Sequence, residues 1–153
     1  MLGSAAQRRD ALRQEADVYV INRENVQWLV DACGNDWPFD MVVLDEASSF
    51  KNHQAKRFKK LKAVRPRIRR MVELTGTPRP RDLMDLWAQL YLLDGGQRLG
   101  KTVTAYRNAW FTPDKRGPGG QVFTWKPRPG AEDEIMARIA EDVYKRQALT
   151  SSP

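Results

Sequence analysis

The sequence predicts an α/β fold in which helices pack on a parallel sheet. Strand-type and helix-type segments alternate between residues 17 and 93, which is typical of strands joined by crossover helices. The segment 41–44 is apolar at every position, as expected of a strand that is covered on both faces. A chain of 153 residues with 41% hydrophobic residues is large enough for one such domain and an appendage.

Local patterns define the elements of this domain. We expect a polar helix over 5–15, a strand over 17–21 and a helix over 26–32 that Asn22 or Asn25 caps. A strand over 41–44 and a helix over 54–64 follow, and Pro66 stops this helix. The last two elements are a strand over 70–74 and an amphipathic helix over 81–93, which ends at Gly95 and Gly96. The order places polar residues at the carboxyl ends of strands, where parallel sheets carry their chemistry.

The remainder of the chain predicts helices and a short hairpin. A helix is expected over 102–111, a Gly/Pro-rich loop over 113–120, a short strand over 122–125 and a helix over 131–143. The chain is then organised as an N-terminal polar helix (1–16), a partial α/β lobe (17–94), a helical and hairpin connection (95–146) and a disordered tail (147–153).

Charge and composition limit the partners. The net charge is +7, and between His53 and Arg70 there are nine Lys or Arg residues and no acid. Such a block favours a polyanion such as DNA as the partner, and the alternative is a solvated helix face. Since Phe58 and Leu61 have helical spacing and face inward, the outer surface holds the candidate DNA-binding residues. They are Lys56, Arg57, Lys59 and Lys60.

Several classes of protein are excluded. One cysteine and one histidine cannot form an internal disulfide or a zinc site. No apolar run is long enough to cross a membrane, and the polar start lacks the apolar core of a secretion signal. We therefore expect no zinc and no membrane partner, and a reducing cytoplasm is the simplest location.

Asp45 and Glu46 are the candidate catalytic residues, because they directly follow the apolar strand. Mg²⁺ takes few protein carboxylates and keeps several waters, so one acid at a strand end, Asp45, suits a hydrated ion that accompanies a nucleoside triphosphate. The next acid, Glu46, is placed to orient and polarise the attacking water. The structural alternative is an acidic strand end that caps the next helix.

These residues resemble motifs of Swi/Snf-type DNA-dependent ATPases. Residues 45–52, Asp-Glu-Ala-Ser-Ser-Phe-Lys-Asn, are similar to the Asp-Glu-x-His-x-x-Lys-Asn box, with Ser48 in place of the usual His, and residues 74–78, Leu-Thr-Gly-Thr-Pro, match motif III. The resemblance extends over 17–145 and is greatest to bacteriophage versions. It implies a partial RecA-like three-layer lobe, ATP as substrate with Mg²⁺, and Thr75, Gly76 and Thr77 as residues that couple ATP to DNA.

A second nucleotide-binding pattern lies at residues 95–102, Gly-Gly-Gln-Arg-Leu-Gly-Lys-Thr, which satisfy the P-loop spacing. A P-loop follows a strand and opens a helix, whereas periodicity predicts a helix before Gly95. The pattern also follows the acidic motif instead of preceding it. We therefore expect Lys101 to have no phosphate role.

The sequence is best interpreted as a fragment of a Swi/Snf-type helicase or translocase. A P-loop and a second RecA-like lobe with its arginine finger are expected elsewhere in the parent chain, so the fragment alone is expected to be inactive. The intact protein would act in the cytoplasm of a bacterial or phage-infected cell. The alternative is a non-catalytic DNA-binding module derived from such a lobe.

Overall fold

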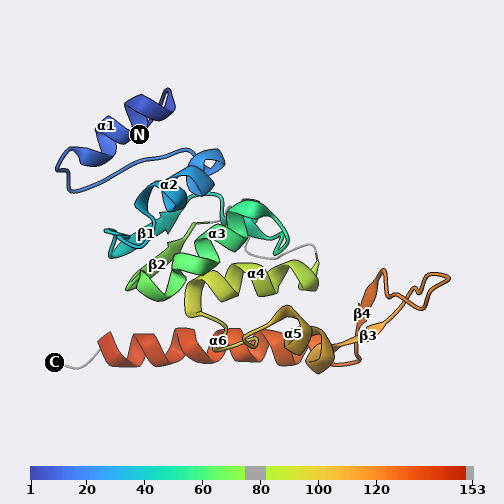
Figure 1. Cartoon of the computed structure of the whole chain (residues 1–153). Coiled ribbons are helices and arrows are strands. Elements are labelled where there is room, and N and C mark those ends of the chain that lie inside the picture. The colour runs from blue at the N-terminus through green and yellow to red at the C-terminus, as the bar shows by residue number, and fades with distance from the viewer. Residues whose placement is uncertain (75–81, 151–153) are drawn as a thin grey trace. The chain divides into compact units, whose positions relative to one another are not determined.

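The computed structural model describes residues 1–74 and 82–150, with side chains described up to residue 140. The chain forms two compact units, residues 1–74 and 75–153, and Figure 1 shows the elements of each. The first unit holds the predicted parallel strands, and the second holds helices and a hairpin. The α/β fold class with a partial sheet is confirmed.

The sheet of the first unit consists of two parallel strands, β1 (Met41–Leu44) and β2 (Arg70–Glu73), with Val42 opposite Met71. The connection between the strands contains α3 (Lys56–Val64), which packs against α2 (Val26–Cys33). Two short 3-10 turns complete this connection, η2 (Ala47–Phe50) and η3 (Arg65–Arg67). The predicted strands 41–44 and 70–74 and both predicted helices are therefore confirmed to within a few residues.

The N-terminal helix is fixed by its cap. In α1 (Ala5–Arg13) the Ser4 hydroxyl accepts from the Gln7 backbone N–H, and the Gln7 side chain accepts from the Ser4 backbone N–H. This capping box satisfies donors that the first helical turn leaves unpaired. The predicted polar helix over 5–15 is confirmed, and none of its residues is buried.

The strand expected over 17–21 does not form. In this segment Val18 and Val20 are 75% and 71% exposed, while Tyr19 packs edge-on against Phe39 with ring centroids 5.4 Å apart. The side chains thus alternate as in a strand, but the backbone joins no ladder among the described residues. Strand propensity reflects packing on a pleated surface, and a segment without a paired neighbour does not become a strand. The helix after it is preceded by the 3-10 turn η1 (Arg23–Asn25).

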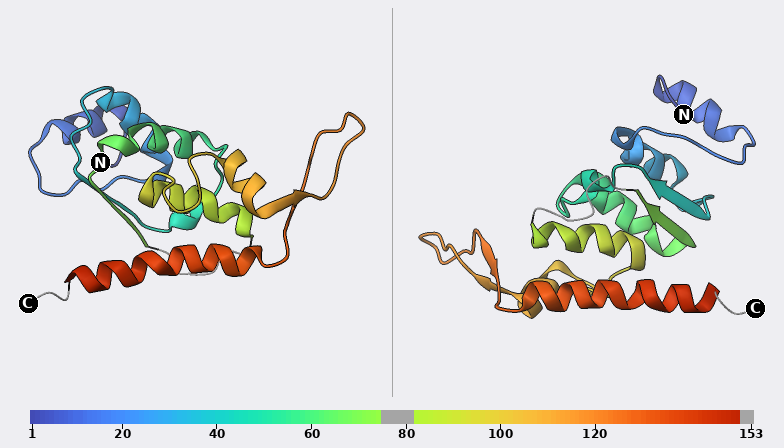
Figure 2. Two further views of the ribbon diagram at one scale, coloured as in Figure 1. Left: turned by 90° about the horizontal axis from the view of Figure 1, so that it is seen from below. Right: turned by 180° about the vertical axis from the view of Figure 1, so that it is seen from behind.

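The second unit contains three helices and a hairpin among its described residues: α4 (Leu83–Asp94), α5 (Val103–Trp110), β3 (Phe111–Pro113), β4 (Trp125–Pro127) and α6 (Ala131–Thr150). Strands β3 and β4 pair antiparallel, and Figure 2 shows the hairpin reaching away from the helices of its unit. The last helix extends into the segment 147–153 that was expected to be disordered. No described helix is both long and apolar enough to span a membrane.

Tyr106 is central to the second unit. It is fully buried, its ring packs against Trp110 and Phe111, and its hydroxyl donates to the Leu83 carbonyl at 2.6 Å. Burial raises the pKa of Tyr106, so the phenol keeps the proton that it donates. The hydrogen bond therefore ties α5 to the start of α4.

We predict that Tyr106→Phe lowers the free energy of unfolding by about 1 kcal/mol, because it removes one buried hydrogen bond and leaves the packing intact. The measurement is urea unfolding followed by circular dichroism. Tyr19→Phe is the matched control, since its hydroxyl donates to the Gln14 carbonyl at an exposed position. Equal effects of the two changes would contradict a structural role for the buried bond.

Candidate functional site

The carboxyl ends of β1 and β2 lie together. Because the strands are parallel, Leu44 and Glu73 are register partners, and the chain leaves both strands at one edge. The Leu74 N–H donates to the Leu44 carbonyl at 2.8 Å, and the Ala47 N–H donates to the Leu74 carbonyl at 3.0 Å. These two bonds hold Leu74, the first residue of the Leu-Thr-Gly-Thr-Pro motif, against the chain that carries Asp45 and Glu46.

The two acidic residues are exposed and their backbone is fixed. Asp45 Oδ1 accepts from the Glu46 N–H at 3.0 Å. Glu46 has φ 52° and ψ 58°, and it is the one non-glycine residue with positive φ among the described residues. The next turn is anchored by Ala47 and Phe50, which are 0% and 1% exposed. A left-handed residue next to a buried anchor turns the chain sharply, so both carboxylates remain at the sheet edge.

Glu46 is paired with Arg23, which the sequence did not single out. Arg23 Nη1 donates to Glu46 Oε2, and its Nε lies 3.3 Å from Glu24 Oε1. Glu24 is also 3.7 Å from Arg57 Nη1 of α3. Hydrogen bonding to Glu46, and then to Glu24, raises the pKa of the Arg23 guanidinium. No sequence pattern indicates this network, because it joins residues 23 positions apart.

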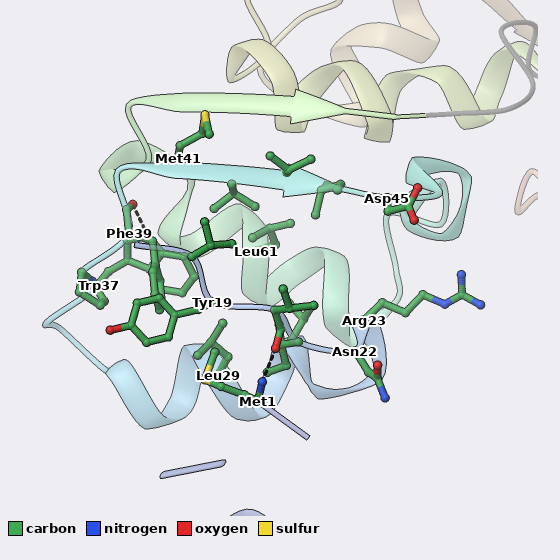
Figure 3. A pocket seen from close by; sticks show the side chains of 18 of the residues that line it. Met1, Tyr19, Asn22, Arg23, Leu29, Trp37, Phe39, Met41, Asp45 and Leu61 are labelled. Atoms are coloured by element: carbon green, nitrogen blue, oxygen red, sulfur yellow. Dashed lines mark hydrogen bonds between the residues drawn. The ribbon is translucent and has the colours of Figure 1, made fainter. Parts of the chain in front are cut away.

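A cavity of about 970 Å³ runs beside β1, between this strand and the unpaired segment 17–21. Figure 3 shows Tyr19, Trp37 and Phe39 at one end of the cavity and Asp45 and Arg23 at the other. Most of the lining residues are apolar, and Asp45, Glu46 and Arg23 line the cavity at the strand end. The cavity lies between the 17–21 segment and β1, which do not pair.

The side chains of the candidate site suit Mg²⁺, which needs few protein ligands. Among the described residues no group of three His, Cys, Asp or Glu side chains is placed to hold a metal. Mg²⁺ is normally held by one or two carboxylates and keeps several waters. Asp45 is exposed at a strand end and has a second oxygen beside the one that accepts from Glu46, so it fits a hydrated Mg²⁺. The expectation of no zinc remains a prediction.

The remaining motif residues are placed in part. Ser48, which stands where the Swi/Snf-type box has His, is exposed in η2. Thr75, Gly76 and Thr77 lie outside the described residues. The structure places Asp45 and Glu46 beside Leu74, which is the first residue of the Leu-Thr-Gly-Thr-Pro motif. The coupling role of Thr75 and Thr77 stays a prediction.

The P-loop-like pattern at 95–102 forms a turn between two helices. The Asp94 carboxylate accepts from the backbone N–H groups of Gly96, Gln97 and Arg98, at 2.7, 3.1 and 3.1 Å. It also pairs with Arg98 Nε at 2.9 Å, and the Asp94 side chain is only 5% exposed. A phosphate would need these N–H groups. Since α4 precedes the turn and a carboxylate already occupies it, the structure argues against a P-loop here.

The basic block is divided between internal pairs and free cations. In α3, Lys60 pairs with Asp31 of α2, and Arg57 pairs with Glu24. Farther along, the Arg67 guanidinium donates to the Gly34 and Asn35 carbonyls at 3.0 and 3.2 Å. Arg57 and Lys60 are thus paired with acids of neighbouring elements at the partly exposed surface of α3, and their role in DNA binding stays a prediction.

Lys56 and Lys59 form the free part of the α3 surface. Both are exposed, and neither makes an ion pair or side-chain hydrogen bond within residues 1–74 and 82–140. They lie one helical turn apart, opposite the buried Phe58 and Leu61. We call these two lysines the α3 basic face.

Comparison with known proteins now identifies the class. The family model of the SNF2-related domain matches residues 3–113, so the chain belongs to the SNF2-related family. This membership confirms the resemblance to Swi/Snf-type proteins that residues 45–52 and 74–78 indicate. No solved structure matches the chain.

Individual relatives come from phage and from fungi. Protein p41 of Acyrthosiphon pisum secondary endosymbiont phage 1 is 40% identical over 147 residues, which are 92% of this chain and 32% of p41. Helicase SWR1 of Yarrowia lipolytica is 35% identical over 117 residues, which are 69% of this chain and 6% of that protein. Helicase swr-1 of Neurospora crassa is 32% identical over 103 residues, which are 65% of this chain and 5% of that helicase. The chain thus spans about a third of p41 and a small part of the helicases.

We predict that Asp94→Ala lowers the free energy of unfolding by about 3–5 kcal/mol, because it removes the buried carboxylate that pairs with Arg98 Nε and accepts from three backbone N–H groups. Chemical unfolding of the purified chain measures this loss. Glu132→Ala, an exposed acid in α6, is the control and should change stability by less than about 0.5 kcal/mol. A loss for Asp94→Ala as small as that of the control would show that Asp94 does not hold the turn.

Proposed function

We propose that the intact protein is an ATP-dependent DNA helicase or translocase of Swi/Snf type. The observation that carries the proposal is the pair of carboxylates, Asp45 and Glu46, at the carboxyl end of β1, joined by backbone bonds to the first residue of the Leu-Thr-Gly-Thr-Pro motif. Membership of the SNF2-related family supports an ATPase as the class of enzyme. Its expected location is the cytoplasm of a bacterial or phage-infected cell.

Each acid has its own part in hydrolysis. Asp45 would hold the hydrated Mg²⁺ that accompanies ATP, and the bound ion would neutralise charge on the phosphate oxygens. Glu46 orients the attacking water by accepting a hydrogen bond from it. To do so its carboxylate has to share or leave the contact with Arg23, which lies beside it. Arg23 is then a positioning residue that holds Glu46 at the edge of the sheet until the water binds.

DNA is the proposed partner of the α3 basic face. Lys56 and Lys59 are exposed, make no ion pair among the described residues and lie on the face of α3 opposite the core. Such a surface binds phosphates without reading the sequence. This observation also supports the alternative function, a DNA-binding module without catalysis. The two functions differ only in whether Asp45 and Glu46 serve ATP hydrolysis.

We predict that Glu46→Gln in the intact protein abolishes ATP turnover and retains ATP binding, because the amide keeps the shape of the side chain and loses its charge. Asp45→Ala should instead weaken binding of Mg·ATP. Phosphate release and a fluorescent ATP analogue measure the two quantities. Glu24→Gln is the matched control, since Glu24 also contacts Arg23 but lies outside the strand end.

Lys101→Ala serves as a second reference for the same assay. Lys101 Nζ donates to the Gly95 carbonyl at 3.1 Å at an exposed position, so its loss should leave turnover near the parental rate. Parental turnover in both Glu46→Gln and Asp45→Ala would exclude the catalytic assignment. Loss of ATP binding in a folded Lys101→Ala protein would instead assign the nucleotide to residues 95–102.

We predict that the double reversal Lys56→Glu and Lys59→Glu lowers the salt dependence of DNA binding by about two units of slope, in a plot of log K against log salt concentration. Each lysine that contacts a phosphate releases about one counterion. Fluorescence anisotropy with a random duplex, between about 50 and 200 mM salt, measures the slope. Arg9→Glu with Arg13→Glu in α1 changes the net charge equally and is the control. The α3 basic face has no role in DNA binding if both double variants behave alike.

A further inference from the structure

The hairpin formed by β3 and β4 is ordered beyond its paired strands. Arg116 and Val122 form an additional bridge, and the Phe123 N–H donates to the Lys115 carbonyl at 2.8 Å. At the tip the Gly117 N–H donates to the Gln121 carbonyl at 2.8 Å. The hairpin therefore presents its side chains on a defined two-stranded scaffold, which extends away from α4, α5 and α6 in both views of Figure 2.

The hairpin carries free positive charge. Lys115, Arg116 and Lys126 are exposed, and none of them makes an ion pair or side-chain hydrogen bond within the part of the chain that the structure describes. The one acid of the hairpin, Asp114, accepts from the Thr124 hydroxyl at 3.0 Å instead of pairing with a cation. The surface thus offers unpaired cations to an anionic partner.

An exposed aromatic ring lies on the same face of the hairpin as one of these cations, Lys115. The antiparallel register puts Phe123 opposite Lys115, and Phe123 shares its face of the hairpin with Trp125 because strand residues alternate. Phe123 is 65% exposed. Its ring lies against the backbone of Gly117, where an added Cβ would be only 2.4 Å from the ring, so glycine at this position leaves room for it.

The neighbouring aromatic residue has a different role. Trp125 is half-buried, and the Arg107 guanidinium lies over its ring with 5.6 Å between Cζ and the ring centroid. This contact joins the base of the hairpin to α5. Phe123 is thereby left as the aromatic residue that is free to stack on a ligand, with Lys115 beside it and with Arg116 and Lys126 on the opposite face.

We propose that this hairpin binds single-stranded nucleic acid by stacking an unpaired base on Phe123 while Lys115, Arg116 and Lys126 contact phosphates. An aromatic platform beside free cations is the combination that such strands use, because every base has a stacking face and every nucleotide has a charge. An acidic protein segment would satisfy the cations and leave the ring in water. The proposal rests on the proposed DNA partner and names a surface separate from the α3 basic face.

The test measures anisotropy of the full 153-residue chain with a labelled single-stranded oligonucleotide, the same strand without bases, and a duplex. Phe123→Ala should weaken binding of the normal strand by about 5- to 140-fold, since one base–aromatic stack contributes about 1–3 kcal/mol and 1.4 kcal/mol is tenfold. Binding of the strand without bases should not change. Phe123→Tyr should restore affinity, and Leu2→Ala, at a residue that is 62% exposed, is the matched control.

Charge reversal provides the second measurement. Lys115→Glu, Arg116→Glu and Lys126→Glu together should lower the salt slope for the single strand by about two, at about 0.7 per phosphate contact. Circular dichroism of each variant checks that the fold is retained. If Phe123→Ala weakens both strands equally, or weakens neither, base stacking is excluded. If the same variants weakened binding of polyglutamate as much as binding of the single strand, the hairpin would be assigned to acidic proteins and the proposal would be overturned.

The measurements can reject the α3 basic face and the hairpin independently of each other. Loss of binding in the hairpin variants, with none in Lys56→Glu and Lys59→Glu, would reject the α3 basic face and retain the hairpin. The reverse result would reject the hairpin and retain α3. No binding of any strand by the folded chain would reject both surfaces.

Discussion

The parallel pairing of β1 with β2 is the constraint on which the candidate site depends. Parallel strands end at the same edge, so two motifs about thirty residues apart in the sequence begin there together. The bonds from Leu74 to Leu44 and from Ala47 to Leu74 extend the ladder past the ends of the strands. The buried Ala47 and Phe50 then anchor the turn that follows Glu46. Without this pairing, Asp45 and Leu74 would have no fixed relation.

Charges that are already paired within the protein separate structural from functional candidates. Asp94 fills the turn that resembles a P-loop, which makes that turn a structural feature of the second unit. Asp31 pairs with Lys60 at the partly exposed surface of α3. Lys56, Lys59 and the cations of the hairpin have no such partners among the described residues. A count of basic residues in the sequence cannot make this distinction, because the paired acids come from other elements.

Local sequence patterns predicted most helices and strands, but they do not specify which distant segments pair with each other. The apolar run 41–44, the Phe58 and Leu61 spacing and the glycine that ends α4 each act over one or two turns, and each element formed as expected. The segment 17–21 has the composition of a strand but lacks a neighbour to pair with, and composition does not specify a neighbour. Asp45 and Glu46 were found from their position after an apolar strand. Arg23 was missed, because its link to Glu46 exists only in the fold.

Asp45 is proposed to hold the metal that accompanies ATP, and iron-directed cleavage of the backbone can locate that metal. Fe²⁺ replaces Mg²⁺ in the intact protein with ATP, and radicals produced at the metal with peroxide and ascorbate then cut the nearby backbone. Mass spectrometry of the fragments locates the cuts. We expect cleavage around residue 45 and near Leu74, and we expect Asp45→Asn to abolish it. Cleavage at residues 95–102, or cleavage that persists in Asp45→Asn, would contradict the proposal.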